Sequence, residues 1–129
     1  MVSKLFSLGA ILAGLAVAIG AFGAHGLEKM VDADALNTWE KAVRYQMYHA
    51  LALFIISWAL VQYPAETKTL INAAWAFIIG IIFFSGSLYF LVLTGTLKLG
   101  PINLAYITPL GGVAFVLGWF WLVMAARRF

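Results

Sequence analysis

Residues 5–24 read LFSLGAILAGLAVAIGAFGA, twenty consecutive positions without a charged side chain. A helix of about 20 apolar residues is long enough to cross the roughly 30 Å hydrocarbon core of a bilayer. Lys4 before the run and the small residues near its end also resemble a cleavable signal peptide, but the apolar core of a signal is shorter, about 7–15 residues. The stretch therefore predicts a retained membrane-spanning helix.

The composition of the whole chain indicates that its solvent is lipid. Hydrophobic residues make up 64% of the sequence and charged residues only 10%, whereas soluble domains carry about 25% charged residues. The net charge is +3, but the basic residues stand singly at the ends of apolar runs, which argues against a nucleic-acid partner. The absence of cysteine excludes disulfides, thiol catalysis and cysteine-ligated metal centres.

Three further apolar runs follow the first, over residues 40–63, 70–93 and 103–126. Polar turns containing proline or glycine separate them, as expected between helices. With residues 5–24 these runs predict an all-α fold, an integral membrane four-helix bundle that forms a single domain over residues 1–129.

The second helix is predicted to begin with an amphipathic extension before it enters the hydrocarbon. Leu36, Trp39 and Val43 share one helical stripe, while Glu40 lies on the other side, a pattern suited to the headgroup region. Asp34 or Asn37 is the predicted N-cap, because side-chain oxygens of these types accept the free N–H groups of a first turn.

Four spans place both termini on the same side of the membrane. Lys and Arg divide evenly between the two sides: Lys4, Lys68, Arg127 and Arg128 on the termini side, and Lys29, Lys41, Arg44 and Lys98 on the other. The residues on the termini side lie closer to the ends of the spans, which favours a cytoplasmic location for both termini. We expect the chain in a bacterial cytoplasmic (inner) membrane.

The predicted topology gathers hydrogen-bonding side chains at the membrane face opposite the termini. The candidate ligand-binding residues are His25, Trp39, Tyr45, His49, Tyr89 and Thr108. An ionisable residue within a span indicates a functional site, and a histidine can exchange protons, bond a quinone oxygen or ligate haem iron. Alternatively, His49 simply bonds a neighbouring helix.

Small residues within the spans predict close helix packing, because they let backbones approach one another in lipid. The predicted packing residues are Gly14, Gly20, Ser85, Gly86, Ser87, Gly111, Gly112 and Gly118. The serines have no basic partner at helical spacing, so we interpret them as packing residues and not as nucleophiles. The chain lacks an HExxH sequence and a metal-spaced cluster, and we predict no catalytic residue, metal or cofactor.

Several segments, in order along the chain, resemble one family of membrane proteins. They are residues 20–27 (GAFGAHGL), 39–53 (WEKAVRYQMYHALAL), 84–89 (FSGSLY), 107–112 (ITPLGG) and 118–119 (GW). Together they are similar to the domain-of-unknown-function 423 family, which is related to transmembrane protein 256 of animals. The resemblance implies four helices in a bacterial cytoplasmic or related organellar membrane, and it implies no activity.

Three functions remain open, which we rank in this order. The first is a non-enzymatic interaction or accessory protein of a membrane complex, with lipid and other membrane proteins or further copies of itself as partners. The second is an oligomer that binds or passes a small solute through the His/Tyr pocket. The third is a quinone- or haem-linked redox subunit.

Overall fold

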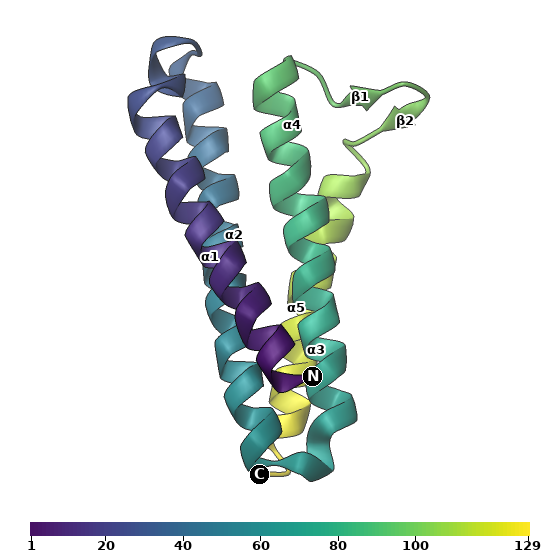
Figure 1. Cartoon of the computed structure of the whole chain (residues 1–129). Helices are drawn as coiled ribbons and strands as arrows, with labels where there is room; N and C mark the ends of the chain where they lie inside the picture. The colour runs from purple at the N-terminus through teal and green to yellow at the C-terminus, as the bar shows by residue number, and fades with distance from the viewer.

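The apolar runs of the sequence form long helices in the computed structural model, which describes residues 1–129 (Figure 1). In chain order the elements are α1 (Val2–His25), the 3-10 turn η1 (Leu27–Lys29), α2 (Ala33–Gln62), the 3-10 turn η2 (Pro64–Glu66), α3 (Thr67–Gly80), the π turn η3 (Ile81–Ser85), α4 (Gly86–Thr94), β1 (Lys98–Leu99), β2 (Ile102–Asn103) and α5 (Ile107–Ala126). The predicted all-α membrane architecture is confirmed.

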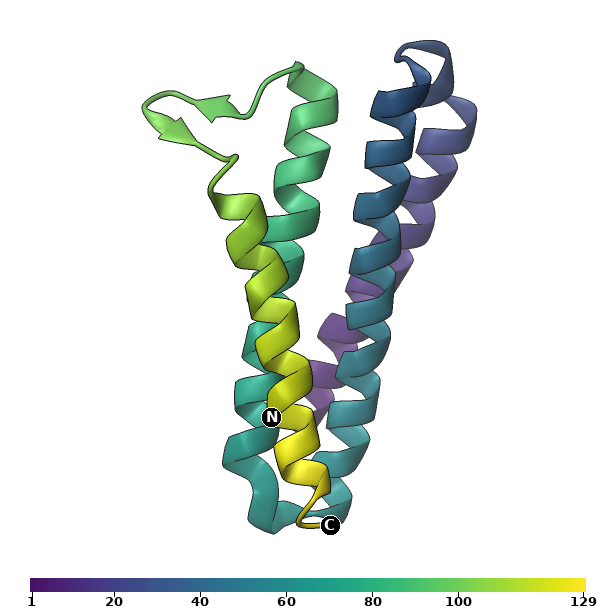
Figure 2. The same cartoon turned by 180° about the vertical axis from the view of Figure 1, so that it is seen from behind.

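Three stretches are long and apolar enough to cross a membrane: Val2–Lys29, Pro64–Thr94 and Ile107–Ala126. The remaining long helix, α2, has 30 residues and carries charged side chains in its first turns. It packs along α1 and runs antiparallel to it over the height of the molecule (Figures 1 and 2). The predicted span 40–63 lies on this helix except for Tyr63, which follows its last residue.

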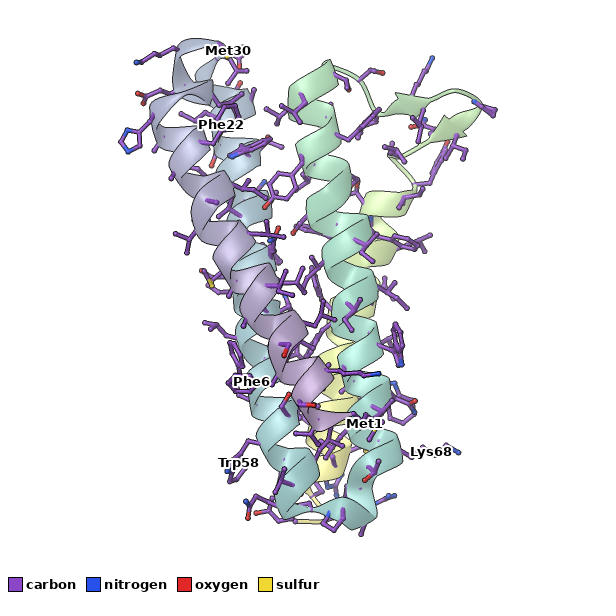
Figure 3. The ribbon with its side chains drawn as sticks, viewed as in Figure 1. Met1, Phe6, Phe22, Met30, Trp58 and Lys68 are labelled. Atoms are coloured by element: carbon purple, nitrogen blue, oxygen red, sulfur yellow. The ribbon has the colours of Figure 1, made fainter.

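The helices form two arms. One arm is the α1–α2 pair, and the other consists of α3, η3 and α4 packed against α5. The arms lie closest at the end that carries both chain termini and diverge toward the end that carries the β1–β2 hairpin (Figures 1 and 2). Leu53 and Ile56 of α2 and Phe77 of α3 are fully buried in the core between them. Met30 and Lys68 mark the two ends of the molecule (Figure 3).

The N-cap of α2 differs from the sequence prediction. The Asp32 carboxylate accepts a hydrogen bond from the Ala35 N–H at 2.8 Å, so the predicted caps Asp34 and Asn37 are wrong. The helix begins at Ala33, and both predicted residues already lie inside it. The amphipathic extension is therefore longer than expected.

The last helix begins later than predicted, at Ile107 instead of residue 103. Asn103 pairs with Lys98 in the antiparallel β1–β2 hairpin. Gly100 takes a φ of +58° between the two strands, a left-handed conformation that glycine adopts without steric cost. The connection between α4 and α5 is thus the longer of the two loops at this end.

Glycines of α3 and α5 let two phenylalanine rings lie against the backbone of the opposite helix. The ring of Phe115 fills the space beside Gly80, and the ring of Phe77 fills the space beside Gly118, so a Cβ atom at either glycine would overlap a ring. Because packing contacts drive helix association in lipid, this reciprocal arrangement holds α5 to α3.

Gly111 packs against the backbone of the π turn. In η3 the N–H of Gly86 bonds to the carbonyl of Ile81, five residues earlier. A Cβ at Gly111 would meet the backbone nitrogen of Phe84 and would lie 2.8 Å from its Cβ. The wide turn and the missing side chain together bring α5 into direct contact with η3.

The other predicted packing glycines have looser surroundings. A Cβ at Gly20 would lie 3.3 Å from Val43 Cγ1, and one at Gly112 would lie 4.0 Å from Phe84 Cδ2. Gly86 has only the Ile81 carbonyl of its own turn at 4.0 Å, and Gly14 has no atom within 4 Å. Gly14 thus contacts no neighbouring helix within one chain, because its side of α1 faces outward.

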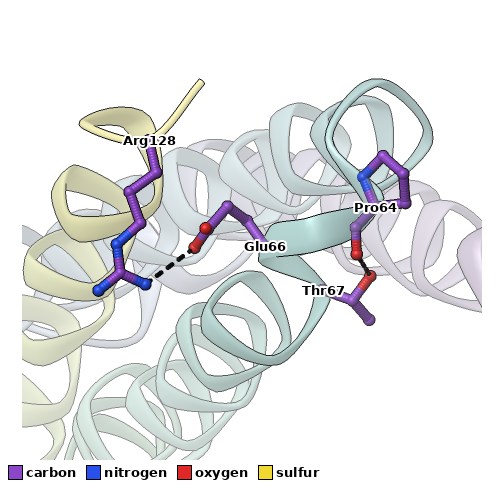
Figure 4. Close-up of polar contacts among 4 residues, drawn as sticks. All are labelled: Pro64, Glu66, Thr67 and Arg128. Carbon is purple, nitrogen blue, oxygen red and sulfur yellow. Dashed lines mark hydrogen bonds and ion pairs between the residues drawn. The ribbon is translucent and has the colours of Figure 1, made fainter.

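The C-terminus is held against the turn between α2 and α3. The ring of Phe129 stacks on Tyr63, with centroids 3.7 Å apart and planes 3° apart. Arg128 Nη1 lies 3.5 Å from Glu66 Oε2 (Figure 4), the one ion pair of the chain. Thr67 donates its hydroxyl to the Pro64 carbonyl at 2.7 Å in the same turn.

Candidate functional site

His49 is the ionisable side chain buried within the predicted spans, and both of its ring nitrogens have partners. Nδ1 lies 2.7 Å from the backbone carbonyl of Tyr45, and the Trp119 indole lies 3.2 Å from Nε2. An indole N–H can only donate a hydrogen bond. Nε2 must therefore accept, and the proton of the neutral imidazole resides on Nδ1, which donates to the carbonyl.

The imidazole is also stacked on an aromatic ring. Its centroid lies 3.5 Å from that of Phe115, with 6° between the planes, and the side chain is 4% exposed. A second proton would place an N–H of His49 against the N–H of Trp119 and leave a charge without an anionic partner. The arrangement therefore favours a neutral histidine that connects α2 to α5.

The position of His49 along α2 differs from the sequence-based interpretation. Sixteen residues separate it from Ala33 at the start of α2, which is about 24 Å at 1.5 Å per residue. Tyr45 and His49 thus lie near the middle of this 30-residue helix and not in its first turns, where the sequence-based interpretation placed them. Because the helix starts at Ala33, counting from residue 40 placed both residues closer to the start of the helix than they are.

A second polar layer lies nearer the hairpin end. Tyr89 donates its hydroxyl to Gln46 Oε1 at 2.9 Å, and the Gln46 amide donates to the Leu12 carbonyl at 2.8 Å. Trp39 donates its indole N–H to the Ile19 carbonyl at 3.0 Å and packs edge-on against Tyr89, with centroids 4.8 Å apart. Trp39 and Tyr89 therefore adjoin one another, but their polar groups serve to join helices.

Thr108 and the serines beside the π turn form a third polar layer. The Thr108 and Ser87 hydroxyls lie 2.6 Å apart, and Ser87 also bonds the Phe84 carbonyl. Ser85 is fully buried and donates to the Ala42 carbonyl of α2 at 2.8 Å. These hydroxyls connect η3 and α4 to α5 and α2, and Thr108 makes no hydrogen bond to a histidine.

His25 lies apart from the other predicted ligand-binding residues. It is the last residue of α1 and is exposed, whereas His49 lies mid-way along α2. The Nε2 atom of His49 already accepts the Trp119 N–H. The two histidines are therefore not arranged as a pair of axial ligands for one haem.

A groove opens on the outer side of His49, between α2 and α5. Its volume is about 500 Å³, and its lining residues are Tyr45, Tyr48, His49, Phe84, Gly112, Phe115, Val116 and Trp119. Tyr45 stacks obliquely on Phe84, with centroids 4.7 Å apart. Of the predicted ligand-binding residues, the structure brings Tyr45 and His49 together here and leaves Trp39, Tyr89, Thr108 and His25 elsewhere.

Comparison with known proteins places the chain in a family. The family model described as protein of unknown function (DUF423) matches residues 19–112. The chain belongs to this family. It is 50% identical to the UPF0382 membrane protein SAB0533 of Staphylococcus aureus, over 98% of each chain. It is 46% identical to the UPF0382 membrane protein YwdK of Bacillus subtilis, over 95% of this chain and 94% of that one.

The membership confirms the predicted resemblance and the membrane assignment. No solved structure matches this DUF423 chain. Its relatives are membrane proteins by name, and their names state no activity.

Sequence reasoning missed two residues of this DUF423 member that organise its polar layers. Gln46 is 4% exposed and accepts from one helix while it donates to another. An amide within a predicted span was the signal that could have identified it. Phe115 forms the surface on which His49 stacks, and a phenylalanine in an apolar helix carries no such signal.

The polar side chains of the interior are engaged in hydrogen bonds. Nowhere in the chain do three His, Asp or Glu side chains come together as metal ligands. His49, Gln46 and the three buried serines, Ser57, Ser85 and Ser87, all have partners within the chain. Apart from Ser57, which bonds to its own helix, these buried polar side chains therefore act as connections between helices.

Proposed function

We propose that this DUF423 protein is a non-enzymatic accessory protein that packs against another membrane protein. Its buried polar groups support this proposal, since His49, Gln46, Ser85 and Ser87 hydrogen-bond within the chain. Polar groups engaged in this way join helices. The surface is then the part of the molecule left to carry a function.

The observation that carries the proposal is the exposed surface of α1. Only three of its 24 residues are buried, Gly9, Ala16 and Gly23. Its outward side carries the small residues Ser3, Ser7, Ala10, Gly14 and Ala18, which we call the outer face of α1. Small side chains at such a face favour close approach of a second helix in lipid.

We propose that four long helices cross the membrane: α1, α2, the continuous α3–η3–α4 stretch and α5. Both termini then lie in the cytoplasm of a bacterial cell. α2 joins the far end of α1 to the near end of α3, so it must return across the bilayer that α1 and α3 cross. Lys4, Lys68, Arg127 and Arg128 then lie on the cytoplasmic side, where basic residues near span ends are preferred.

Photo-crosslinking from the outer face of α1 tests the accessory role. The residue p-benzoylphenylalanine replaces Ala10 in the full chain, expressed in its own membrane. Val123 of α5, which is 57% exposed, provides the matched position on a lipid-facing surface of large side chains. We expect a discrete adduct with a second membrane protein from position 10, identified by mass spectrometry, and none from position 123.

Two other results of the crosslinking experiment would contradict the accessory role. Adducts of equal yield from both positions would contradict a dedicated partner surface on α1. An adduct of two copies of this chain from position 10 would replace the accessory role with self-association.

A further inference from the structure

We propose that the groove between α2 and α5 binds a membrane-soluble small molecule whose flat ring bears hydrogen-bond-accepting oxygens, the chemistry of a quinone head group. This goes beyond the accessory role, because the groove and the outer face of α1 share no residue. Only binding is inferred, with no electron transfer.

The size and position of the groove suit such a ligand. Its volume of about 500 Å³ falls within the range of about 300–1,000 Å³ that is usual for small-molecule sites. Tyr48 is 56% exposed and Val116 is 69% exposed at its edges. Because these edges lie near the middle of their helices, the groove opens sideways to the hydrocarbon, and a ligand dissolved in the membrane can enter it directly.

The aromatic walls of the groove favour a flat ring. His49 and Phe115 form a parallel stack with centroids 3.5 Å apart, and Tyr45 leans over Phe84 at 4.7 Å. Trp119 is held in place by its hydrogen bond to His49 and is 43% exposed. Offset stacking and edge contacts with these rings stabilise a planar guest.

Two tyrosines supply hydroxyl groups at the groove. Tyr45 and Tyr48 line the groove, and neither hydroxyl takes part in the hydrogen bonds of the chain, unlike that of Tyr89. They lie 12 and 15 residues from the start of α2, about 18 and 22 Å along the helix. They follow Arg44, the last Lys or Arg of α2, where the helix enters its apolar part, and an unpaired hydroxyl that faces an apolar groove is costly.

A quinone-type ring satisfies these hydroxyls better than a partner helix does. A backbone carbonyl of a helix already accepts the hydrogen bond of that helix and offers only its second lone pair to a neighbour, as the Leu12 carbonyl does to Gln46. The carbonyl oxygens of a quinone dissolved in hydrocarbon have no donor, so they gain a bond from either tyrosine. The groove therefore fits an acceptor-bearing small molecule, with the tyrosines as donors and the stacked rings as its walls.

The test is a binding titration with decylubiquinone as the probe. The full chain is reconstituted into lipid nanodiscs free of quinone, and quenching of tryptophan fluorescence is followed above the linear quenching that partition into lipid causes. We expect a saturable component equivalent to one site per chain. Trp119→Phe should remove most of that component, because Trp119 is the tryptophan that lines the groove.

Filling the groove provides the decisive variant. A Cβ at Gly112 would meet only Phe84 Cδ2, at 4.0 Å, so Gly112→Leu extends into the groove without a backbone clash. We expect its apparent Kd to rise at least about tenfold, with unfolding temperature close to that of the wild type. Gly14→Leu, in open space on α1, is the matched control and should bind as the wild type does.

The hydroxyl is tested separately. Tyr48→Phe should weaken binding roughly 2- to 10-fold, the effect of one hydrogen bond. Tyr106→Phe, at a residue that is 75% exposed and outside the groove, should leave the Kd unchanged. Absence of saturable quenching, or wild-type binding by Gly112→Leu, would overturn the proposal. A change of assembly mass in Gly112→Leu without quinone binding would assign the groove to a partner helix and would also overturn it.

Discussion

Trp119 donates its indole N–H to Nε2 of His49 across 3.2 Å, although 70 residues separate the two in the chain. The bond connects α2 in one arm of the molecule to α5 in the other. It lies beside the His49–Phe115 stack and near the middle of both helices. The histidine thus acts as a neutral acceptor midway along both helices, and a neutral imidazole costs less to bury than a charged one.

Loss of the hydrogen bond alone and loss of the whole His49 ring should lower the free energy of unfolding by different amounts. Trp119→Phe removes one interhelical hydrogen bond and should lower the free energy of unfolding by about 0.6–1.7 kcal/mol. His49→Ala also removes the stacked ring and leaves a cavity, so it should cost about 2–4 kcal/mol. Unfolding in mixed micelles measures both, and equal losses would show that the hydrogen bond and not the packing dominates.

Close contact at the π turn should make Gly111 intolerant of any side chain. Gly111→Ala places a methyl group against the backbone of Phe84, which cannot rotate away, and should destabilise the protein by at least about 1–3 kcal/mol. Gly14→Ala meets open space and should be neutral or more stable by about 0.5–1 kcal/mol, because alanine favours the helix. The same micelle assay compares the two, and a tolerated Gly111→Ala would contradict the packing of α5 on η3.

The Tyr89–Gln46 hydrogen bond should behave as a coupled pair. Tyr89→Phe leaves the Gln46 carbonyl oxygen without its donor and should cost about 1 kcal/mol. Gln46→Leu removes the acceptor, so the further loss on adding Tyr89→Phe should be close to zero. A double-mutant cycle in detergent measures this coupling, and additive losses would argue that the two side chains act independently.

The four-span topology should appear as a two-sided labelling pattern. The chain has no cysteine, so single substitutions report without background. Lys68→Cys should react with an impermeant maleimide only from the cytoplasmic side, whereas Met30→Cys and Lys98→Cys should react only from outside. Labelling of intact cells against inverted vesicles makes the comparison. Reaction of Lys68→Cys and Lys98→Cys from the same side would rule out a membrane crossing between these two positions.

The sequence predicted the helical class and the approximate positions of the long helices, because the apolar runs are continuous and long. The sequence misplaced the start of α2 and the start of α5, where neighbouring residues compete to form the cap or the turn. Asp32 caps α2 in place of Asp34 or Asn37, since all three are good capping residues and the pattern does not choose among them. Asn103 is drawn into the hairpin with Lys98, a pairing that hydropathy does not reveal.

The candidate site was predictable only in part. His49 and Tyr45 lie four residues apart on α2, so helical spacing alone brings them together. Phe84, Phe115 and Trp119 complete the groove from η3 and α5, and nothing local links them to His49. The sequence-based prediction grouped residues that were expected at the same membrane face. It therefore included His25, which is exposed at the end of α1.

By itself the sequence determined that this protein lives in lipid as a bundle of long helices, because transfer of apolar surface and backbone satisfaction within each helix are local properties of the chain. The tertiary structure decided which polar side chains meet and at what depth. His49 joins Trp119, Gln46 joins Tyr89, and Gly111 faces Phe84 because the rotation and offset of packed helices set those contacts. Rotation and offset depend on the shapes of side chains from distant segments, and composition and periodicity do not specify them.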